Sequence, residues 1–262
     1  MQGNSQQQAY DRGTNIFSPD GRLYQVEYAR EAVKRGSPTV GVRFDDGENA
    51  GVVFVAGGRL RSSLQVADSI EKIHKTDDHV GVASAGHVAD ARQLVDVARR
   101  QAQVERLRYG EPASIEALTK EVTGYIQEYT QAGGARPFGA ALLVGGVDDD
   151  GTPHLFETDP SGTPYEWEAV SIGGNSEKIQ GYLEAEYEAD ADADGALELA
   201  LRALDDAAEG GLESEGMSAA VVDEDGYRAL TGAELEETID GHGLAGETET
   251  GDGMDDSDET DN

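Results

Sequence analysis

The sequence predicts an α+β fold in which two mostly antiparallel β-sheets stack between two outer layers of helices, a four-layer α/β/β/α sandwich. Three observations support this prediction. Strand patterns come in runs, helix patterns come in pairs, and the two kinds alternate from the first strands to the last. Asp-Gly turns join neighbouring strand patterns, which favours hairpins over parallel crossovers. Helix pairs outside two stacked sheets bury every apolar face in a single core.

The strand patterns are placed by their alternation and by the turn residues beside them. Residues 138–147 form a run without a charged side chain, which is typical of a strand buried on both faces. Asp46-Gly47, Asp150-Gly151 and Asp225-Gly226 mark turns between successive strands. The patterns predict strands over residues 40–44, 51–55, 80–85, 138–147, 155–156, 167–172, 218–222 and 227–230.

The helix patterns carry their own start and stop signals. Ser114 precedes an apolar stripe at helical spacing, and Thr231 with Glu234 forms the pattern of a capping box. Gly36 and Gly110 follow the first two stripes and mark their ends. The patterns predict helices over residues 23–33 and 88–108, and further helices that begin near Ser114, Asn175, Asp194-Gly195 and Thr231.

Charge divides the chain into two unlike halves. The 262 residues include 53 acidic and 20 basic side chains, for a net charge of −33. Residues 1–136 hold 18 acidic and 17 basic side chains, whereas residues 137–262 hold 35 acidic and 3 basic ones. The nearly neutral half predicts surfaces that contact partners without repulsion, and the acidic half predicts a solvated outer wall.

This composition restricts the setting and the partners of the protein. An acidic excess with few lysines suits a salt-rich cytosol, where salt screens the repulsion, so it favours a halophile's protein. An acidic interaction protein of ordinary cytosol is the alternative. Nucleic acid and anionic membranes are excluded as main partners, because phosphate binding needs clustered Lys and Arg. A polar, uncharged N-terminus and the absence of a long apolar run predict a soluble, cytoplasmic protein.

No motif predicts a metal or cofactor. The chain has no Cys, which excludes disulfides, a zinc ribbon and a Cys nucleophile. None of the five His residues falls in a metal-binding pattern. Asp190, Asp192, Asp194 and Gly195 match the first half of a calcium loop, but its twelfth position holds Leu201 instead of Glu. A turn between two helices is the preferred interpretation of this segment.

The most specific pattern lies near the N-terminus. It runs from Tyr10-Asp11-Arg12 through Phe17-Ser18-Pro19-Asp20-Gly21-Arg22-Leu23-Tyr24-Gln25-Val26-Glu27-Tyr28-Ala29 and combines aromatics, a Pro turn and a charged triplet before a helix. This segment resembles the N-terminal signature of proteasome α subunits. The resemblance continues through Ser69-Ile70-Glu71-Lys72-Ile73, through Gly86-His87-Val88-Ala89-Asp90-Ala91-Arg92 and through Gly133-Gly134-Ala135-Arg136-Pro137-Phe138-Gly139, and covers about residues 7–240.

The resemblance implies a fold and a role. The family has the fold of N-terminal-nucleophile hydrolases, which agrees with the predicted sandwich. Its α subunits form heptameric rings, stack on rings of proteolytic β subunits, control the passage of unfolded substrates and dock an activating AAA ATPase. They do not cut peptides. With the acidic composition, the chain is similar to haloarchaeal members. We therefore expect a non-catalytic subunit without cofactors, divided into a flexible gate (1–9), a folded domain (10–240) and a disordered acidic tail (241–262).

The resemblance also assigns roles to residues of this sequence. Lys72 matches the lysine that binds the carboxylate of an activator tail, Gly86 lines the same pocket, and Glu27 and Arg30 brace it. A second set matches the cluster that holds the gate open. It comprises Tyr10, Asp11, Arg12, Pro19 and Tyr28. The annulus below the gate would consist of Ala132, Gly133 and Gly134, although many archaeal relatives have an aromatic residue at the position of Ala132.

Two other interpretations stay open at this point. A processed hydrolase would expose Thr39 as its N-terminal nucleophile, but processing there would remove the whole signature. A lysine that supports the nucleophile in active members is expected near Gly57-Gly58-Arg59, where the sequence has none. The second of these interpretations is a stand-alone acidic adaptor protein that has the same fold.

Overall fold

The computed structural model describes residues 24–58, 62, 64–69, 71–131, 136–208, 212 and 214–244. Its helices are α2 (Tyr24–Lys34), α3 (Val88–Tyr109), α4 (Ile115–Gln131), α5 (Ser176–Glu186), α6 (Ala193–Ala207), α7 (Gly232–Gly241) and a 3₁₀ turn, η1 (Ala67–Ser69). Its strands are β1 (Thr39–Asp45), β2 (Ala50–Ala56), β3 (Ile73–Asp77), β4 (Val80–Gly86), β5 (Ala140–Val147), β6 (Pro153–Thr158), β7 (Pro164–Glu166), β8 (Ala169–Ile172), β9 (Ser218–Asp223) and β10 (Gly226–Ala229).

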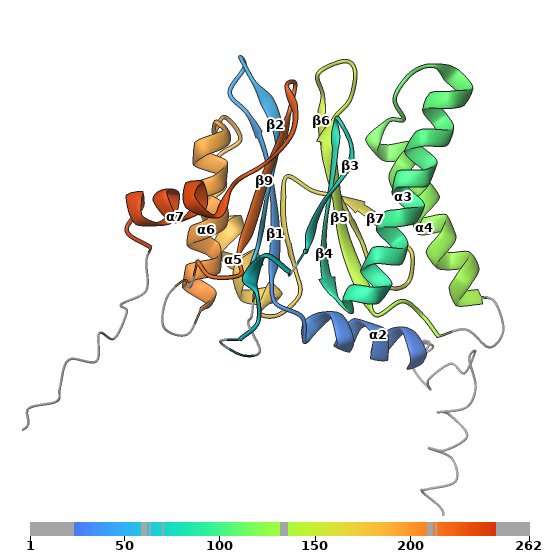
Figure 1. The fold of residues 1–262 in the computed structure, drawn as a ribbon, viewed down its shortest axis with the longest axis horizontal. Helices are drawn as coiled ribbons and strands as arrows, with labels where there is room; N and C mark the ends of the chain where they lie inside the picture. The colour runs from blue at the N-terminus through green and yellow to red at the C-terminus, as the bar shows by residue number, and fades with distance from the viewer. Residues whose placement is uncertain are drawn as a thin grey trace, which may run out of the picture.

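The strands form two five-stranded sheets that face each other (Figure 1). The first has the order β10-β9-β2-β1-β8 and the second the order β3-β4-β5-β6-β7. Every pair of neighbouring strands is antiparallel. Helices α5, α6 and α7 cover the first sheet, and α3 and α4 cover the second. The predicted four-layer sandwich is therefore confirmed.

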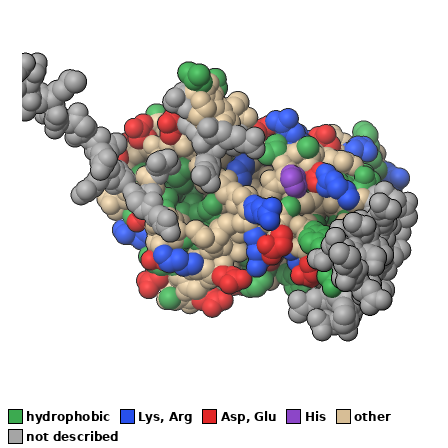
Figure 2. Space-filling view, turned by 90° about the horizontal axis from the view of Figure 1, so that it is seen from below, with side chains coloured by type: hydrophobic (Ala, Val, Ile, Leu, Met, Phe, Trp, Pro, Cys, Tyr) green, Lys and Arg blue, Asp and Glu red, His purple; other side chains and the backbone are tan. Residues whose placement is uncertain are grey.

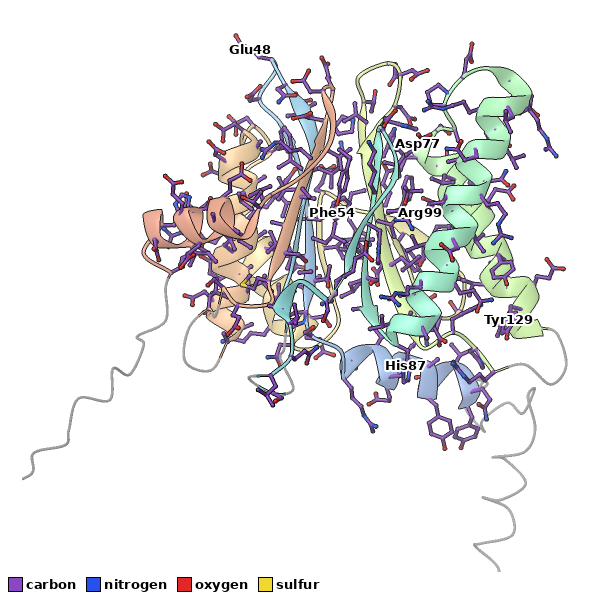
Figure 3. The ribbon with its side chains drawn as sticks, in the orientation of Figure 1. Glu48, Phe54, Asp77, His87, Arg99 and Tyr129 are labelled. Carbon is purple, nitrogen blue, oxygen red and sulfur yellow. The ribbon has the colours of Figure 1, made fainter. Side chains whose placement is uncertain are left out.

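Three apolar layers hold these elements together. One lies between the two sheets, around fully buried residues such as Phe54 and Leu143 (Figure 3). The other two lie between each sheet and its helices, where Leu94 and Leu201 are examples. Burial of each such side chain contributes roughly 1.5–3 kcal/mol, so the sandwich is stabilised mainly by these layers.

The sequence patterns located most elements correctly. The predicted capping box of α7 is present, with Thr231 Oγ1 accepting from Glu234 N and Glu234 Oε2 accepting from Thr231 N. Ser114 accepts from Ala117 N at the start of α4, as expected. A distant residue completes that cap, because Asp148 Oδ1 accepts from Ile115 N at 2.9 Å.

Two strand predictions need correction. The strand expected over residues 167–172 is shorter in the structure, where β8 covers Ala169–Ile172, and the preceding strand β7 was not predicted. The two strands belong to different sheets, since β7 pairs with β6 and β8 pairs with β1. The chain crosses from one sheet to the other at Trp167–Glu168, which no local pattern reveals. Strand β3 was not predicted, because Ile73–Asp77 is mostly polar. Its pairing with β4 makes it a strand.

Helix α2 stands apart from the four layers. It lies across the lower end of the sandwich in Figure 1, and it buries Val26, Ala29 and Val33 there. Figure 2 shows the molecule from this side: basic, acidic and apolar side chains are interspersed on the face. Glu27, Tyr28 and Arg30, which the sequence singled out, lie on α2 at this end of the molecule.

Candidate functional site

A cavity of about 900 Å³ opens beside the C-terminal end of α2. It lies between the turn that follows α2, the segment before β3, and the junction of β4 with α3. The residues around it include basic, acidic and small side chains. They are Ala32, Arg35, Gly36, Ser37, Gln65, Ser69, Glu71, Lys72, Ser84, Ala85, Gly86, His87 and Val88. Lys72 and Gly86, which the sequence assigned to one pocket, do line the same cavity.

The hydrogen-bond partners of the buried Lys72 amine are all uncharged groups. Its side chain is 7% exposed. Its Nζ lies 2.9 Å from Ser37 O, 3.0 Å from Ser37 Oγ, 3.1 Å from Pro38 O and 3.0 Å from Gly57 O. No carboxylate of the described residues forms an ion pair with it. An ammonium has three protons for these four oxygens, so the site satisfies its hydrogen bonds but not its charge.

Burial lowers the pKa of Lys72 to about 7. The cause is desolvation, which disfavours the charged form. Arg35, Glu71 and His87 are the other ionisable side chains that line the cavity. An anion that enters it would supply the missing compensation, and so the cavity is suited to a carboxylate.

Gly86 shapes the cavity wall through its backbone. Its φ of +103° lies in a region that residues with a side chain rarely adopt. A Cβ at this position would lie 2.3 Å from Gly139 O. Only glycine fits here, which keeps the wall beside Lys72 free of a side chain.

Glu27, Tyr28 and Arg30 lie on α2. Arg30 donates to Glu27 Oε1 at 2.7 Å and to Asp159 Oδ2 at 2.7 and 3.1 Å. Burial lowers the pKa of Arg30, but Asp159 and Glu27 outweigh it and raise the value. Glu27 and Arg30 thus pair as their spacing predicted, yet they do not line the Lys72 cavity. A bracing role, from α2 of this chain or of a neighbouring copy, stays a prediction.

Tyr28 is 54% exposed, and its ring lies 6.5 Å from that of Tyr24. It lines a second, smaller cavity of about 230 Å³ together with His87 and Arg136. His87 lines both cavities and so connects them, at the end of the molecule where Figure 3 labels it. Tyr10, Asp11, Arg12 and Pro19 of the predicted gate cluster, and Ala132, Gly133 and Gly134 of the predicted annulus, lie outside the described residues.

A buried carboxylate close to both cavities was missed in the sequence. Asp90 at the start of α3 accepts from Arg136 at 2.6 and 2.7 Å and from Gly139 N at 2.8 Å. Burial raises the pKa of Asp90, but the Arg136 guanidinium and the Gly139 N–H outweigh it and lower the value. This pair ties α3 to the residues just before β5. The two residues are 46 positions apart, so no local pattern indicates them.

The hydroxyl of Thr39 is not placed to act as a nucleophile. Thr39 is fully buried, and its Oγ1 donates to Ser84 O at 3.0 Å. The residue that reaches Gly57 is Lys72, from 15 positions further along the chain. The sequence has no lysine near Gly57-Gly58-Arg59, but the fold brings the Lys72 amine into hydrogen-bonding contact with the Gly57 carbonyl.

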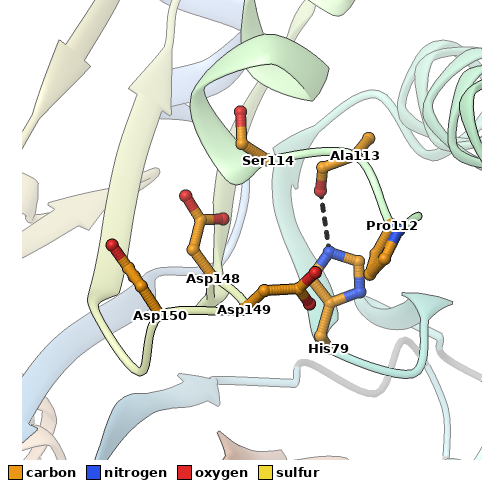
Figure 4. Close-up of a pocket in the computed structure, with 7 residues that line it drawn as sticks. All are labelled: His79, Pro112, Ala113, Ser114, Asp148, Asp149 and Asp150. Atoms are coloured by element: carbon orange, nitrogen blue, oxygen red, sulfur yellow. Dashed lines mark hydrogen bonds between the residues drawn. The ribbon is translucent and has the colours of Figure 1, made fainter. Parts of the chain in front are cut away.

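A further cavity of about 260 Å³ lies at the base of α4, on the turn beyond β5 (Figure 4). His79 Nε2 donates to Ala113 O at 2.8 Å there, close to Asp148, Asp149 and Asp150. Among the residues that the structure describes, no cluster of His, Asp and Glu has the arrangement of a metal site. The Asp192 side chain instead caps α6 by accepting from Gly195 N at 2.8 Å.

Comparison of the sequence with known protein families supports the fold described above. The family model for proteasome subunits matches residues 33–222, and the model for the N-terminal signature of A-type proteasome subunits matches residues 10–32. The chain is a member of the proteasome α-subunit family.

Its relatives come from salt-loving archaea. It is 63% identical to the proteasome alpha 2 subunit of Haloarcula marismortui over 94% of this chain and all of the relative. It is 59% identical to the proteasome alpha subunit of Halobacterium salinarum, over 92% of this chain and 94% of the relative. It is 58% identical to the proteasome alpha 1 subunit of Haloferax volcanii, over 93% and 96%. The predicted halophilic character is confirmed by these similarities.

Membership of the family explains why the fold has the layers of a hydrolase. Within the described residues, none of the helices is long and apolar enough to cross a membrane. The cavity around Lys72 is the feature of this chain that indicates a role.

Proposed function

We propose that the chain is a non-catalytic subunit of the outer ring of a 20S proteasome in the cytoplasm. Seven copies assemble into the ring, which stacks on a ring of proteolytic β subunits. The ring controls the passage of unfolded proteins into the chamber and docks an AAA ATPase. Residues 1–9 act as the gate. The folded domain, expected over residues 10–240, extends to Leu244, which is buried in the core, and the residues after it form a solvating tail.

The observation that carries the docking role is the Lys72 cavity. A buried ammonium with only neutral oxygens around it attracts an anion, and the charge-assisted hydrogen bond that results is stronger than a neutral one. Of its four oxygen partners only the Ser37 hydroxyl turns freely. A carboxylate at the end of an activator's tail therefore takes the place of Ser37 Oγ on Lys72. Gly86, which also lines the cavity, adds no side chain to the wall beside that carboxylate.

The absence of peptidase activity in this chain is supported by the position of Thr39. An N-terminal nucleophile must carry its own free amine beside its hydroxyl. Thr39 begins β1 as a fully buried residue, and its hydroxyl is already bonded to a backbone carbonyl. The signature that precedes it, over residues 10–32, belongs to the intact chain.

The docking role is tested by Lys72→Ala in particles assembled with β subunits. Loss of a charge-assisted hydrogen bond costs about 2–3 kcal/mol, so activator tails should bind about 30- to 150-fold more weakly and ATPase stimulation should disappear. The matched control is Lys75→Ala, because Lys75 is 49% exposed and pairs with Asp78 instead of lining the cavity. Normal stimulation of the Lys72→Ala particle would refute the assignment.

A synthetic activator tail provides a direct binding assay. Its free-acid form should bind the assembled ring, and the same peptide with a C-terminal amide should not, because the amide lacks the charge that Lys72 needs. Equal binding of the two forms would exclude a carboxylate anchor.

Assembly and gating have separate tests. Native mass spectrometry of the chain should detect a seven-membered ring that acquires peptidase activity only with β subunits. A monomer at all salt concentrations would favour the stand-alone adaptor. Deletion of residues 2–10 should raise basal peptide hydrolysis by the complete particle. An unchanged rate would mean that this segment is not the gate.

A further inference from the structure

The wall of the large cavity contains a hydroxyl and an amine in direct contact. Ser37 Oγ lies 3.0 Å from Lys72 Nζ. Ser37 is partly buried and lines the cavity, so a small molecule in the cavity reaches its hydroxyl. The other three oxygens on Lys72 Nζ are the backbone carbonyls of Ser37, Pro38 and Gly57.

The chemistry of these four oxygens determines which way the amine points. Carbonyl oxygens only accept hydrogen bonds, whereas a serine hydroxyl both donates and accepts. A neutral Lys72 amine has two protons and one lone pair. In the structure Lys72 Nζ donates to Ser37 Oγ, as an ammonium does. Once it has lost one proton, its two remaining protons can go to carbonyls, and its lone pair can then accept from Ser37 Oγ–H. This is the arrangement of a nucleophilic serine with a lysine base.

The other hydroxyls around the cavity lack this arrangement. Ser84 Oγ is buried and donates to the Lys72 carbonyl at 3.2 Å. Ser69 Oγ donates to Val66 O at 2.6 Å, and Ser69 is exposed. Thr39 does not line the cavity. Among the described residues, Ser37 alone combines exposure to the cavity with an amine partner.

We propose that Ser37 is an acyl acceptor, with the Lys72 amine as its base, and that the cavity takes small activated acyl donors such as aryl esters and thioesters. The proposal does not depend on the docking role. The reaction yields an ester on an internal residue, so it is a covalent modification of the cavity wall. An acylated Ser37 also fills the space beside Lys72.

The acyl transfer balances without any further reagent. Lys72 Nζ takes the proton of Ser37 Oγ while Oγ forms a bond to the acyl carbon. The bond from that carbon to the leaving phenolate or thiolate then breaks. Lys72 returns its proton to the leaving group, and the products are the Ser37 ester and a free phenol or thiol. Because burial lowers the pKa of Lys72 to about 7, a large share of the amine is free to act as a base near neutral pH.

The test uses the full-length chain in its assembled state, with p-nitrophenyl acetate as the probe. One acetyl group per chain should appear with a matching burst of nitrophenolate, and peptide mapping should place it on Ser37. Neutral hydroxylamine should remove it, since esters are cleaved and lysine amides are not. The burst rate should rise with pH as one group with a pKa near 7 titrates.

Three variants separate a chemical role from a structural one. Ser37→Ala should abolish the burst and still assemble, because it keeps the backbone carbonyl that holds Lys72. Lys72→Arg keeps a cation that does not lose its proton, and it should slow acylation on the order of 100-fold. Ser69→Ala, the control on the same wall, should acylate normally. A burst of equal size in Ser37→Ala, or an acetyl group mapped to Lys72, would overturn the proposal.

Discussion

Strand β3 has a buried ionisable side chain at each end, and only one of the two side chains has a counterion among the described residues. Lys72 precedes the strand and Asp77 ends it, and each side chain is 7% exposed. Asp77 accepts from Arg106 at 3.0 Å through both of its oxygens, so its charge is compensated within the chain. Lys72 has only neutral partners and lines an open cavity. Figure 3 labels Asp77 at the end of the strand that lies away from α2.

This difference separates a structural charge from a functional one. A buried ion with its counterion in place has little to gain from a further partner. A buried ion without a counterion has already paid part of its desolvation and gains from any ligand that brings the opposite charge. The Lys72 end is therefore the end where binding is expected, and the Asp77 end is part of the architecture.

The largest expected effect comes from giving Lys72 a counterion within the chain, as Asp77 already has. Ser37→Asp places a carboxylate beside Lys72, where the serine hydroxyl now lies 3.0 Å away. The internal ion pair should exclude an activator's carboxylate and weaken tail binding about 100-fold. Isothermal titration with the synthetic tail measures this, and a thermal melt confirms folding. Unchanged affinity would mean that neutralising the Lys72 charge within the chain does not affect docking.

The converse change breaks the ion pair between Asp77 and Arg106 at the other end of β3. Asp77→Ala leaves Arg106 without its partner and should lower the free energy of unfolding by about 2 kcal/mol, because Arg106 is itself 41% exposed and can turn to water. Tail binding should not change. Denaturant unfolding measures the first result and titration the second. A loss of tail binding at normal stability would show that the two ends are coupled.

The pH dependence of tail binding reports the charge of Lys72 directly. Burial holds its pKa at about 7 in the free site, so it is protonated and competent below that pH. Above it the ammonium is lost, and affinity should fall about fivefold from pH 7 to pH 8, while the proton uptake on binding rises from about one half at pH 7 toward one at pH 8. Titrations in buffers of different ionisation enthalpy count that proton. Affinity that stays constant to pH 9 would contradict a depressed pKa.

A partly exposed ion pair provides the baseline with which the effects at the two ends of β3 are compared. Arg202 donates to Glu198 at 2.7 Å on the outer face of α6, where the two side chains are 42% and 33% exposed. Arg202→Ala should cost about 0.5 kcal/mol or less, and less still in high salt. Denaturant unfolding at two salt concentrations checks this. A cost as large as that of Asp77→Ala would remove the distinction between buried and surface pairs.

Most of the architecture could be predicted from local sequence patterns. The apolar stripe of α3, the all-apolar run of β5 and the capping box of α7 each encode their element within a few residues. The patterns did not reveal β3, because polar residues such as Lys75 say nothing of strand structure without a paired neighbour. They also missed β7 and the change of sheet before β8, because membership of a sheet depends on pairing with distant strands.

The candidate site was only partly predictable. Lys72 and Gly86 were found through the family signature, and Glu27 with Arg30 through helical spacing. Ser37 was not found, because its role depends on a contact between residues 35 positions apart. Asp90 and Arg136 were missed for the same reason. The sequence has no lysine near Gly57, and the contact of Lys72 with Gly57 O, from 15 positions further along the chain, could not be read from it.

The sequence alone determined the positions of most elements, the α-type signature and the division of charge between two halves. Each of these is written in residues that lie close together or in composition, so no contact has to be known. Only the tertiary structure decided which carbonyls surround Lys72, which arginine neutralises Asp77 and where the chain changes sheets. Those outcomes depend on strand register and packing between distant segments, and burial then turns them into altered charge, pKa and reactivity.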